Sequence, residues 1–204
     1  METDGSDARR LGIVIADVSG KGISAAILMA FIRPVIRAAV DHTGNPVAAL
    51  ERTNRILVEE RPTGLLVTAL CGILDLDSGL FRFANAGHEE PLLVSPAAGG
   101  GRPSWVTGGG PLLGAFRTLD LAECTVTLGP GDVLVLYTDG VTDAAAPGGE
   151  RFGADRFAML VRERCLVSAA AAVQTVMDAV GGWEGGEPAD DLALLIVRRT
   201  PPAG

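Results

Sequence analysis

The sequence contains few of the residues that build common metal and redox sites. Its 204 residues include 2 histidines, His42 and His88, which are too few for a histidine-rich zinc or iron centre. The 3 cysteines, Cys71, Cys124 and Cys165, are odd in number and far apart. This spacing suits neither a disulfide framework nor a CxxC zinc site, so we interpret them as reduced thiols of the core.

Basic residues and long apolar runs are scarce as well. With 17 basic against 25 acidic residues the net charge is −8, and no basic stripe is visible in the sequence. A surface of this charge repels a polyanion, so nucleic-acid binding is disfavoured. Uninterrupted apolar runs stay below the roughly 18 residues that span a bilayer, and the polar, acidic start of the chain is unlike a signal peptide. We therefore expect a cytoplasmic protein with no membrane partner.

The hydrophobic residues that are present, 48% of the chain, suffice for one substantial core. We expect a polar segment over residues 1–10, a single domain over 11–199 and a tail over 200–204. Hydrophobic patterning and turn residues predict the secondary structure. Strands are expected over 11–16, 65–76, 80–86, 91–95, 122–128, 133–137 and 192–198, and helices over 23–40, 46–60, 154–164 and 168–180.

Glycine and proline predict where helices and strands are interrupted. Pro34 lacks an N–H donor, which predicts a kink in the first helix or its division into two. Glycine clusters predict surface loops over 97–115 and 181–188. Because two helices come early and two late, around hairpin-linked strands, the fold class is predicted to be α+β, an antiparallel sandwich with helices packed outside the sheets.

Aspartates stand at the ends of three strands that read as buried. Asp17 follows the first strand, Asp139 follows the 133–137 strand, and Asp190-Asp191 precede the last strand. Each aspartate alone has an ordinary interpretation, as a cap, a turn residue or the end of a loop. If the three strand ends converge, however, their carboxylates share a small volume and need protons or cations. Oxygen ligands without imidazole or thiolate suit Mg²⁺ or Mn²⁺.

A second pattern in the sequence is typical of nucleotide-binding proteins. Gly20-Lys21-Gly22-Ile23-Ser24-Ala25 fits G-x-G-x-x-A between a strand and a helix. No second strand ending in an acidic residue follows, and Asp41 falls at the end of a helix. Nucleotide binding therefore lacks the context that the pattern requires.

An ordered series of motifs resembles the PPM-type (protein phosphatase 2C-like) bacterial serine/threonine phosphatases of the sporulation-stage-II-E and sigma-factor-regulation branch. The resemblance covers about residues 11–198, and its specificity comes from the order of individually weak motifs. These are Ala16-Asp17-Val18-Ser19-Gly20-Lys21-Gly22, Ala25-Ala26, Leu28-Met29, Asn85-Ala86-Gly87-His88, Pro91-Leu92-Leu93, Pro111-Leu112-Leu113-Gly114, Gly129-Pro130-Gly131-Asp132, Tyr137-Thr138-Asp139-Gly140-Val141-Thr142-Asp143 and Asp190-Asp191-Leu192.

The resemblance implies an α-β-β-α sandwich with two divalent metals, Mn²⁺ or Mg²⁺, and no catalytic side chain beyond the metal-bound water. Asp17 would bridge both metals, the Val18 carbonyl would touch the second, and Asp139 and Asp190 would complete the first. Asp191 would lie just behind the ligands. The implied reaction is attack of the water on phosphoserine or phosphothreonine of a regulatory partner, typically an anti-sigma-factor antagonist.

Three further residues have less defined roles. Gly20 is expected to allow tight backbone geometry beside the metals. Lys21 is able to attract phosphate, although a solvated turn lysine explains it equally well. His88 is a proton carrier or, as we favour, a residue that orders the end of a hairpin.

One feature of the resembled family is missing. A G-D-x-x-x-D segment usually precedes the first motif and supplies a ligand to the second metal, and none occurs before Asp17. The second metal is therefore in doubt, and three explanations stay open. The chain is part of a larger protein, in which sensor domains often lie upstream; or it keeps one metal with weak activity; or it is a phosphatase-like module that binds a phosphorylated partner without hydrolysing it.

Overall fold

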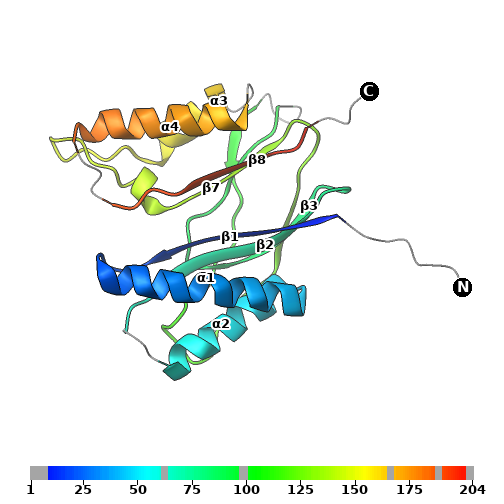
Figure 1. The fold of residues 1–204 in the computed structure, drawn as a ribbon. Coiled ribbons are helices and arrows are strands. Elements are labelled where there is room, and N and C mark those ends of the chain that lie inside the picture. Colours follow the sequence, from blue (N-terminus) through cyan, green and yellow to red (C-terminus); the bar gives the residue numbers. More distant parts are fainter. Residues whose placement is uncertain (1–8, 61–63, 97–100, 165–167, 187–189, 201–204) are drawn as a thin grey trace, which may run out of the picture. The chain divides into compact units, whose positions relative to one another are not determined.

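The computed structural model describes residues 9–60, 64–96, 101–164, 168–186 and 190–200. It divides the chain into two compact units (Figure 1). Unit 1 comprises Met1–Gly87 and Gly108–Thr127, and unit 2 comprises His88–Thr107 and Leu128–Gly204. The expectation of one domain over residues 11–199 stays a prediction.

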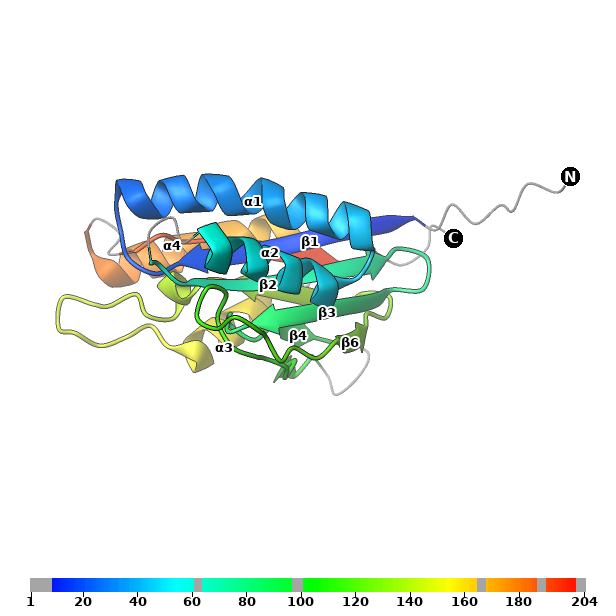
Figure 2. The ribbon, with the colours of Figure 1, turned by 90° about the horizontal axis from the view of Figure 1, so that it is seen from below.

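Unit 1 contains a four-stranded antiparallel sheet covered by two helices. The sheet order is β1 (Arg10–Val18), β2 (Val67–Asp75), β3 (Leu80–Ala86) and β6 (Cys124–Thr127). Helices α1 (Ile23–Thr43) and α2 (Pro46–Glu60) pack against it, α1 beside β1 and α2 beside β2 and β3 (Figure 2). The core between helices and sheet includes Ile32, Leu50 and Val67, all fully buried.

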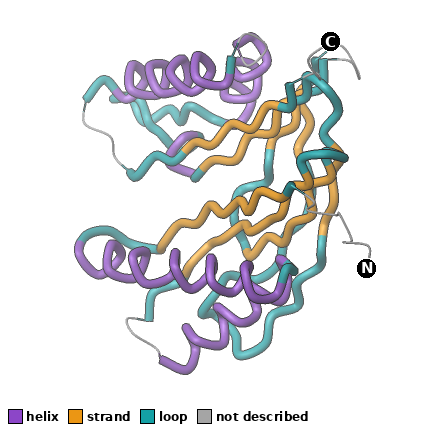
Figure 3. The backbone as a smooth tube through the Cα atoms, turned by 45° about the vertical axis from the view of Figure 1, so that its right-hand side comes forward, coloured by secondary structure: helices purple, strands orange, loops and turns teal. Residues whose placement is uncertain are grey.

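Unit 2 repeats this plan with shorter strands. Its sheet order is β5 (Pro103–Trp105), β4 (Leu92–Val94), β7 (Val133–Tyr137) and β8 (Leu194–Arg198), again all antiparallel. Helices α3 (Ala154–Arg164) and α4 (Ala169–Glu184) flank this sheet (Figure 3), and a 3-10 turn, η1 (Asp139–Val141), follows β7. Two antiparallel sheets with two helices each confirm the predicted α+β class.

Of the two alternatives predicted at Pro34, the division into two helices is wrong, since α1 runs without interruption from Ile23 to Thr43. The kink stays a prediction. Pro34 cannot donate to the carbonyl of Ala30. Both residues are exposed, so water is able to replace the missing donor. The helix ends instead at Gly44, which adopts a left-handed conformation and donates its N–H to the Val40 carbonyl.

The predictions of glycine-rich loops over 97–115 and 181–188 are also wrong in part. Within 97–115, the described residues include β5, which pairs with β4. The ring of Trp105 in β5 also packs against the ring of Tyr137, at 6.1 Å between centroids. Helix α4 continues through Gly181 and Gly182 to Glu184. Glycine lowers helix propensity but does not end a helix that is otherwise packed.

Among the described helices, α1 is long and apolar enough to cross a membrane by length and composition alone. The sequence of this helix contains no uninterrupted apolar run of that length, because it includes Arg33 and Arg37. This criterion is weak evidence, since core helices of other proteins also meet it. One face of α1, which includes Leu28 and Ile36, is buried in the core of unit 1, whereas Ile23 and Ile27 stay exposed.

Candidate metal centre

Asp17 lies near the end of β1, in register with Thr68 of β2. Side chains alternate between the two faces of a strand. Ile13 and Ile15 are buried, and Asp17 continues their face with a partly buried side chain. The intervening Ala16 belongs to the face that looks toward α1. The Asp17 carboxylate is therefore on the face of the sheet opposite to that helix.

The turn after Asp17 is fixed to the segment before β2. The Ser19 N–H donates to the Leu66 carbonyl at 2.8 Å, and the Leu66 N–H donates to Ser19 Oγ at 2.9 Å. Gly20 and Gly22 both have φ of 89°, a conformation that L side chains rarely adopt. This agrees with tight backbone geometry at Gly20, while Lys21 between them is exposed.

The side chain of Val18, the other predicted ligand of unit 1, lies in the hydrophobic core. Val18 is buried, pairs with Val67 of β2 and contributes to the apolar cluster under the helices. Its predicted role concerns only the backbone carbonyl, so burial of the side chain is compatible with it.

In unit 2, Thr138 ties the end of β7 to the start of the last strand. Its N–H donates to the Ala193 carbonyl at 3.1 Å, and its hydroxyl accepts from the Ala193 N–H at 3.0 Å. The same hydroxyl donates to the Asp191 carbonyl at 3.2 Å. Thr138 precedes Asp139 directly, so these bonds bring the Asp139 turn beside the Asp190–Asp191 segment.

Gly140 allows this approach. A Cβ added at Gly140 would overlap the carbonyl oxygen of Asp191, so no side chain fits there. The turn itself is closed by the Asp143 N–H, which donates to the Asp139 carbonyl at 2.7 Å. Asp139, Asp190 and Asp191 are all exposed. Two of the predicted ligand positions, 139 and 190, thus lie on adjoining segments of unit 2.

Sequence reasoning missed Glu89 as a neighbour of this site. Tyr137 Oη donates to Glu89 Oε2 at 3.5 Å. Partial burial raises the pKa of the Glu89 carboxyl, and the charges of Asp139 and Asp143 raise it further. Burial, followed by the charge of Glu89, also raises the pKa of Tyr137. The available sequence signal was the pair of glutamates after His88, but their proximity to Asp139 depends on tertiary structure.

His88 is buried, with 8% of its surface exposed, and has a hydrogen bond with the backbone of Tyr137. Burial lowers the pKa of its imidazole to about 4. The ring is therefore neutral near pH 7. This location fits a residue that orders the start of unit 2, and neither predicted role of His88 is tested by it.

The predicted ligands are divided between the two units, Asp17 and Val18 in unit 1 and Asp139 and Asp190 in unit 2. Within the part of the chain that the structure describes, no three His, Cys, Asp or Glu side chains form a group able to hold a metal. The donors available are carboxylates and a backbone carbonyl. This chemistry fits Mg²⁺ or Mn²⁺ and does not fit a soft transition metal.

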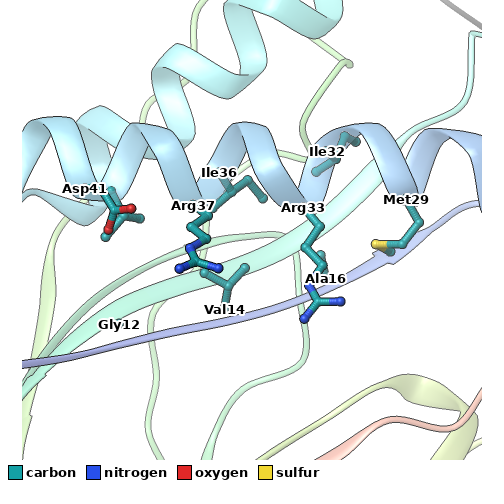
Figure 4. A pocket seen from close by; sticks show the side chains of 10 residues that line it. Gly12, Val14, Ala16, Met29, Ile32, Arg33, Ile36, Arg37 and Asp41 are labelled. Atoms are coloured by element: carbon teal, nitrogen blue, oxygen red, sulfur yellow. The ribbon is translucent and has the colours of Figure 1, made fainter.

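A cavity of about 470 Å³ in unit 1 lies between β1 and α1 (Figure 4). Val14 and Ala16 line it from the strand, and Arg33 and Arg37 point from the helix toward the strand. Asp17 does not line this cavity. The cavity is therefore separate from the predicted metal ligands.

Residues 7–200 match the family model of stage II sporulation protein E (SpoIIE). The chain belongs to the SpoIIE family. Phosphoserine phosphatase RsbU of Bacillus subtilis is 28% identical over 193 residues, which cover 95% of this chain and 57% of RsbU. Protein IcfG of Synechocystis is 25% identical, over 93% of this chain and 34% of IcfG. The chain thus spans 57% of one of these curated relatives and 34% of the other.

Solved structures confirm the fold of this SpoIIE-family chain. The structure of the RsbU and RsbW domains of Rv1364c from Mycobacterium tuberculosis has a TM-score of 0.76 and 30% identity, over 95% of this chain and 54% of that one. The SiaA-PP2C domain of Pseudomonas aeruginosa has a TM-score of 0.80, at 23% identity. The relatives named phosphoserine phosphatase, RsbU and RsbP of Bacillus subtilis, support the predicted enzyme class, a protein phosphatase.

Proposed function

We propose that this chain is the catalytic part of a metal-dependent serine/threonine protein phosphatase. The observation that carries the proposal is the junction of the Asp139 turn with the Asp190–Asp191 segment in a SpoIIE-family chain. Thr138 and Gly140 hold two strand ends together, so that the carboxylates of Asp139 and Asp190 lie on adjoining segments. Family membership supplies the reaction class, and the donor chemistry supplies the metal class.

The metal would be held by Asp17, the Val18 carbonyl, Asp139 and Asp190, with Asp191 behind them. A bound Mn²⁺ or Mg²⁺ supplies Lewis acidity, which lowers the pKa of a water and offsets phosphate charge. Gly20 keeps the backbone beside Asp17 free of a side chain. Tyr137, through Glu89, fixes an additional negative charge near Asp139. A second metal, as in the resembled family, remains part of the proposal.

The proposed substrate is phosphoserine or phosphothreonine on a cytoplasmic regulatory protein of the anti-sigma-factor-antagonist type. RsbU- and RsbP-type homologues, and an RsbW domain in a solved neighbour, support partners in sigma-factor regulation. Because the chain spans only part of the length of its relatives, sensor domains in the whole protein belong to the same proposal.

The test is Mn²⁺-dependent hydrolysis of a chromogenic aryl phosphate by the 204-residue chain and its Asp139→Asn variant. Loss of a metal ligand should lower the rate about 100-fold or more, because activation of the water requires the metal. Asp155→Asn is the matched control, since Asp155 is an exposed aspartate of unit 2 on α3.

An unchanged rate in Asp139→Asn would remove Asp139 from the site. If the parent and the variant are both inactive while circular dichroism shows folded protein, the enzyme assignment fails for this chain. The alternative from the sequence, a module that only binds a phosphorylated partner, would then be the better description.

A further inference from the structure

A second cavity of unit 1, of about 270 Å³, lies between α2 and the segment that follows Leu113. It is separate from the cavity between β1 and α1, with which it shares no lining residue. Polar side chains predominate in its lining. The lining residues are Glu51, Asn54, Arg55, Arg117, Thr118 and Leu119.

Asn54 builds this cavity by fixing the loop to the helix. Its side chain is buried, with 1% exposed. Asn54 Oδ1 accepts from the Gly114 N–H at 2.8 Å, and Asn54 Nδ2 donates to the Phe116 carbonyl at 2.9 Å. Both ends of its amide are therefore used to hold the loop. Arg117 follows directly after the second anchor point, so its backbone position is set by α2.

The cavity carries a local excess of positive charge. Arg55 and Arg117 are exposed, and neither guanidinium has a hydrogen bond or an ion pair with any described residue. Glu51 is the one acidic residue in the lining. Two guanidinium groups at one cavity, without a partner among the described residues, are able to hold an oxyanion, because arginine pairs with carboxylate and phosphate through two parallel hydrogen bonds.

Hydrogen bonds connect the segment that lines this cavity to the end of the sheet that carries Asp17. Asn54 holds Gly114, and the neighbouring Leu113 exchanges two backbone hydrogen bonds with Val67, at 2.9 and 3.2 Å. Val67 pairs with Val18, directly after Asp17. The cavity and the backbone of Asp17 are thus connected through paired segments at one end of the sheet of unit 1.

We propose that the cavity of Arg55 and Arg117 binds an oxyanion of the protein substrate, an acidic side chain at some distance from the phosphorylated residue. This inference rests on the proposed function, because it gives the proposed phosphatase a preference for phosphoproteins with acidic segments. The arginines act in binding and not in the chemical step. The cavity raises the affinity for an acidic segment that the negative surface of the chain would otherwise repel.

The test compares two phosphoserine peptides that differ only in flanking residues, glutamates in one and glutamines in the other. The parent chain is expected to hydrolyse the glutamate peptide with the higher kcat/KM. Arg55→Gln/Arg117→Gln should lower kcat/KM for this peptide about tenfold, mainly through KM, and abolish the preference. Hydrolysis of a small aryl phosphate should stay within about twofold of the parent rate, since that probe cannot reach the cavity.

The matched control is Arg52→Gln/Arg162→Gln, which removes the same charge from two exposed arginines that do not line the cavity. It should keep the preference for the glutamate peptide. Equal loss in both double variants would show a general charge effect and overturn the proposal, as would a parent that does not distinguish the two peptides.

A binding measurement separates this proposal from the proposed function. Fluorescence anisotropy of the labelled glutamate peptide should show Arg55- and Arg117-dependent binding even if the chain hydrolyses nothing, in which case only the proposed function fails. Inorganic phosphate is the second probe. If phosphate alone stabilises the parent against heat and not Arg55→Gln/Arg117→Gln, without any preference between peptides, the cavity binds free phosphate and the peptide assignment is overturned.

Discussion

Gly140 is the residue on which the approach of two aspartate-bearing segments depends. A methyl group at this position would overlap the Asp191 carbonyl oxygen, which is backbone and cannot turn aside. Gly140→Ala should therefore lower the free energy of unfolding by about 1–3 kcal/mol and lower metal-dependent hydrolysis, because Asp139 and Asp190 separate. Urea denaturation and the aryl-phosphate assay measure the two effects.

Gly148→Ala is the control for this substitution. Gly148 is in the same unit, and nothing lies within 4 Å of a Cβ added to it. It should keep both stability and activity. Unchanged activity of the Gly140→Ala protein would mean that the spacing between the Asp139 turn and the Asp190–Asp191 segment does not matter for the site.

His88 gives the unfolding free energy a defined pH dependence. Its pKa is lowered to about 4 in the folded chain from the ordinary 6.5. The unfolded state therefore binds the proton more readily, so the contribution of His88 is complete above pH 6.5 and is lost as the pH falls toward 4. This loss amounts to about 3 kcal/mol at most. Urea denaturation at pH 7.5, 5.5 and 4.5 measures it.

His88→Gln should flatten this acid dependence, although its stability at pH 7.5 is also expected to fall. His42→Gln is the control, because His42 is exposed at the end of α1. If both variants keep the slope of the parent between pH 6.5 and 4.5, other groups cause it and the burial of His88 has no influence on acid stability.

At the scale of elements, the sequence predicted strands and helices well where local periodicity is strong. Both ends of α2, Pro46 and Glu60, match the predicted helix, and at its start Asn45 accepts a capping hydrogen bond from the Ala48 N–H. The prediction of secondary structure fails where features other than the local periodicity determine the conformation. Strand β5 forms beside β4 in a segment that the sequence predicts as a loop. Helix α1 passes through Pro34, where the carbonyl left without a donor is on an exposed residue.

The same distinction applies to the candidate site. The sequence predicts Asp139 and Asp190 as metal ligands because each carboxylate stands next to an apolar strand in the sequence itself. Glu89 and the contact of Gly140 with Asp191 are not predicted, because each joins segments about 50 residues apart in the chain. Asp139-Gly140 alone is an ordinary turn pair, and only the tertiary contact explains why a glycine is required there.

At the scale of the whole molecule, the proposed ligand set draws Asp17 from unit 1 and Asp139 and Asp190 from unit 2. A ligand that binds only the folded state raises stability by RT ln(1 + [L]/Kd), which is about 2.7 kcal/mol at a concentration of 100 Kd. Mn²⁺ should therefore raise the Tm of the parent chain by several degrees at saturation. Differential scanning fluorimetry with and without Mn²⁺ measures this shift without any need for turnover.

The variants decide whether both units contribute ligands. Asp17→Asn and Asp139→Asn should each lose most of the Mn²⁺-dependent shift, because removal of either carboxylate weakens the same cation. Asp120→Asn, an exposed aspartate of unit 1, should keep it. A full shift in Asp17→Asn together with its loss in Asp139→Asn would confine the metal to unit 2. Such a result would contradict the proposed bridging role of Asp17, and the carboxylates beside Thr138 and Gly140 would then be sufficient for the metal that remains.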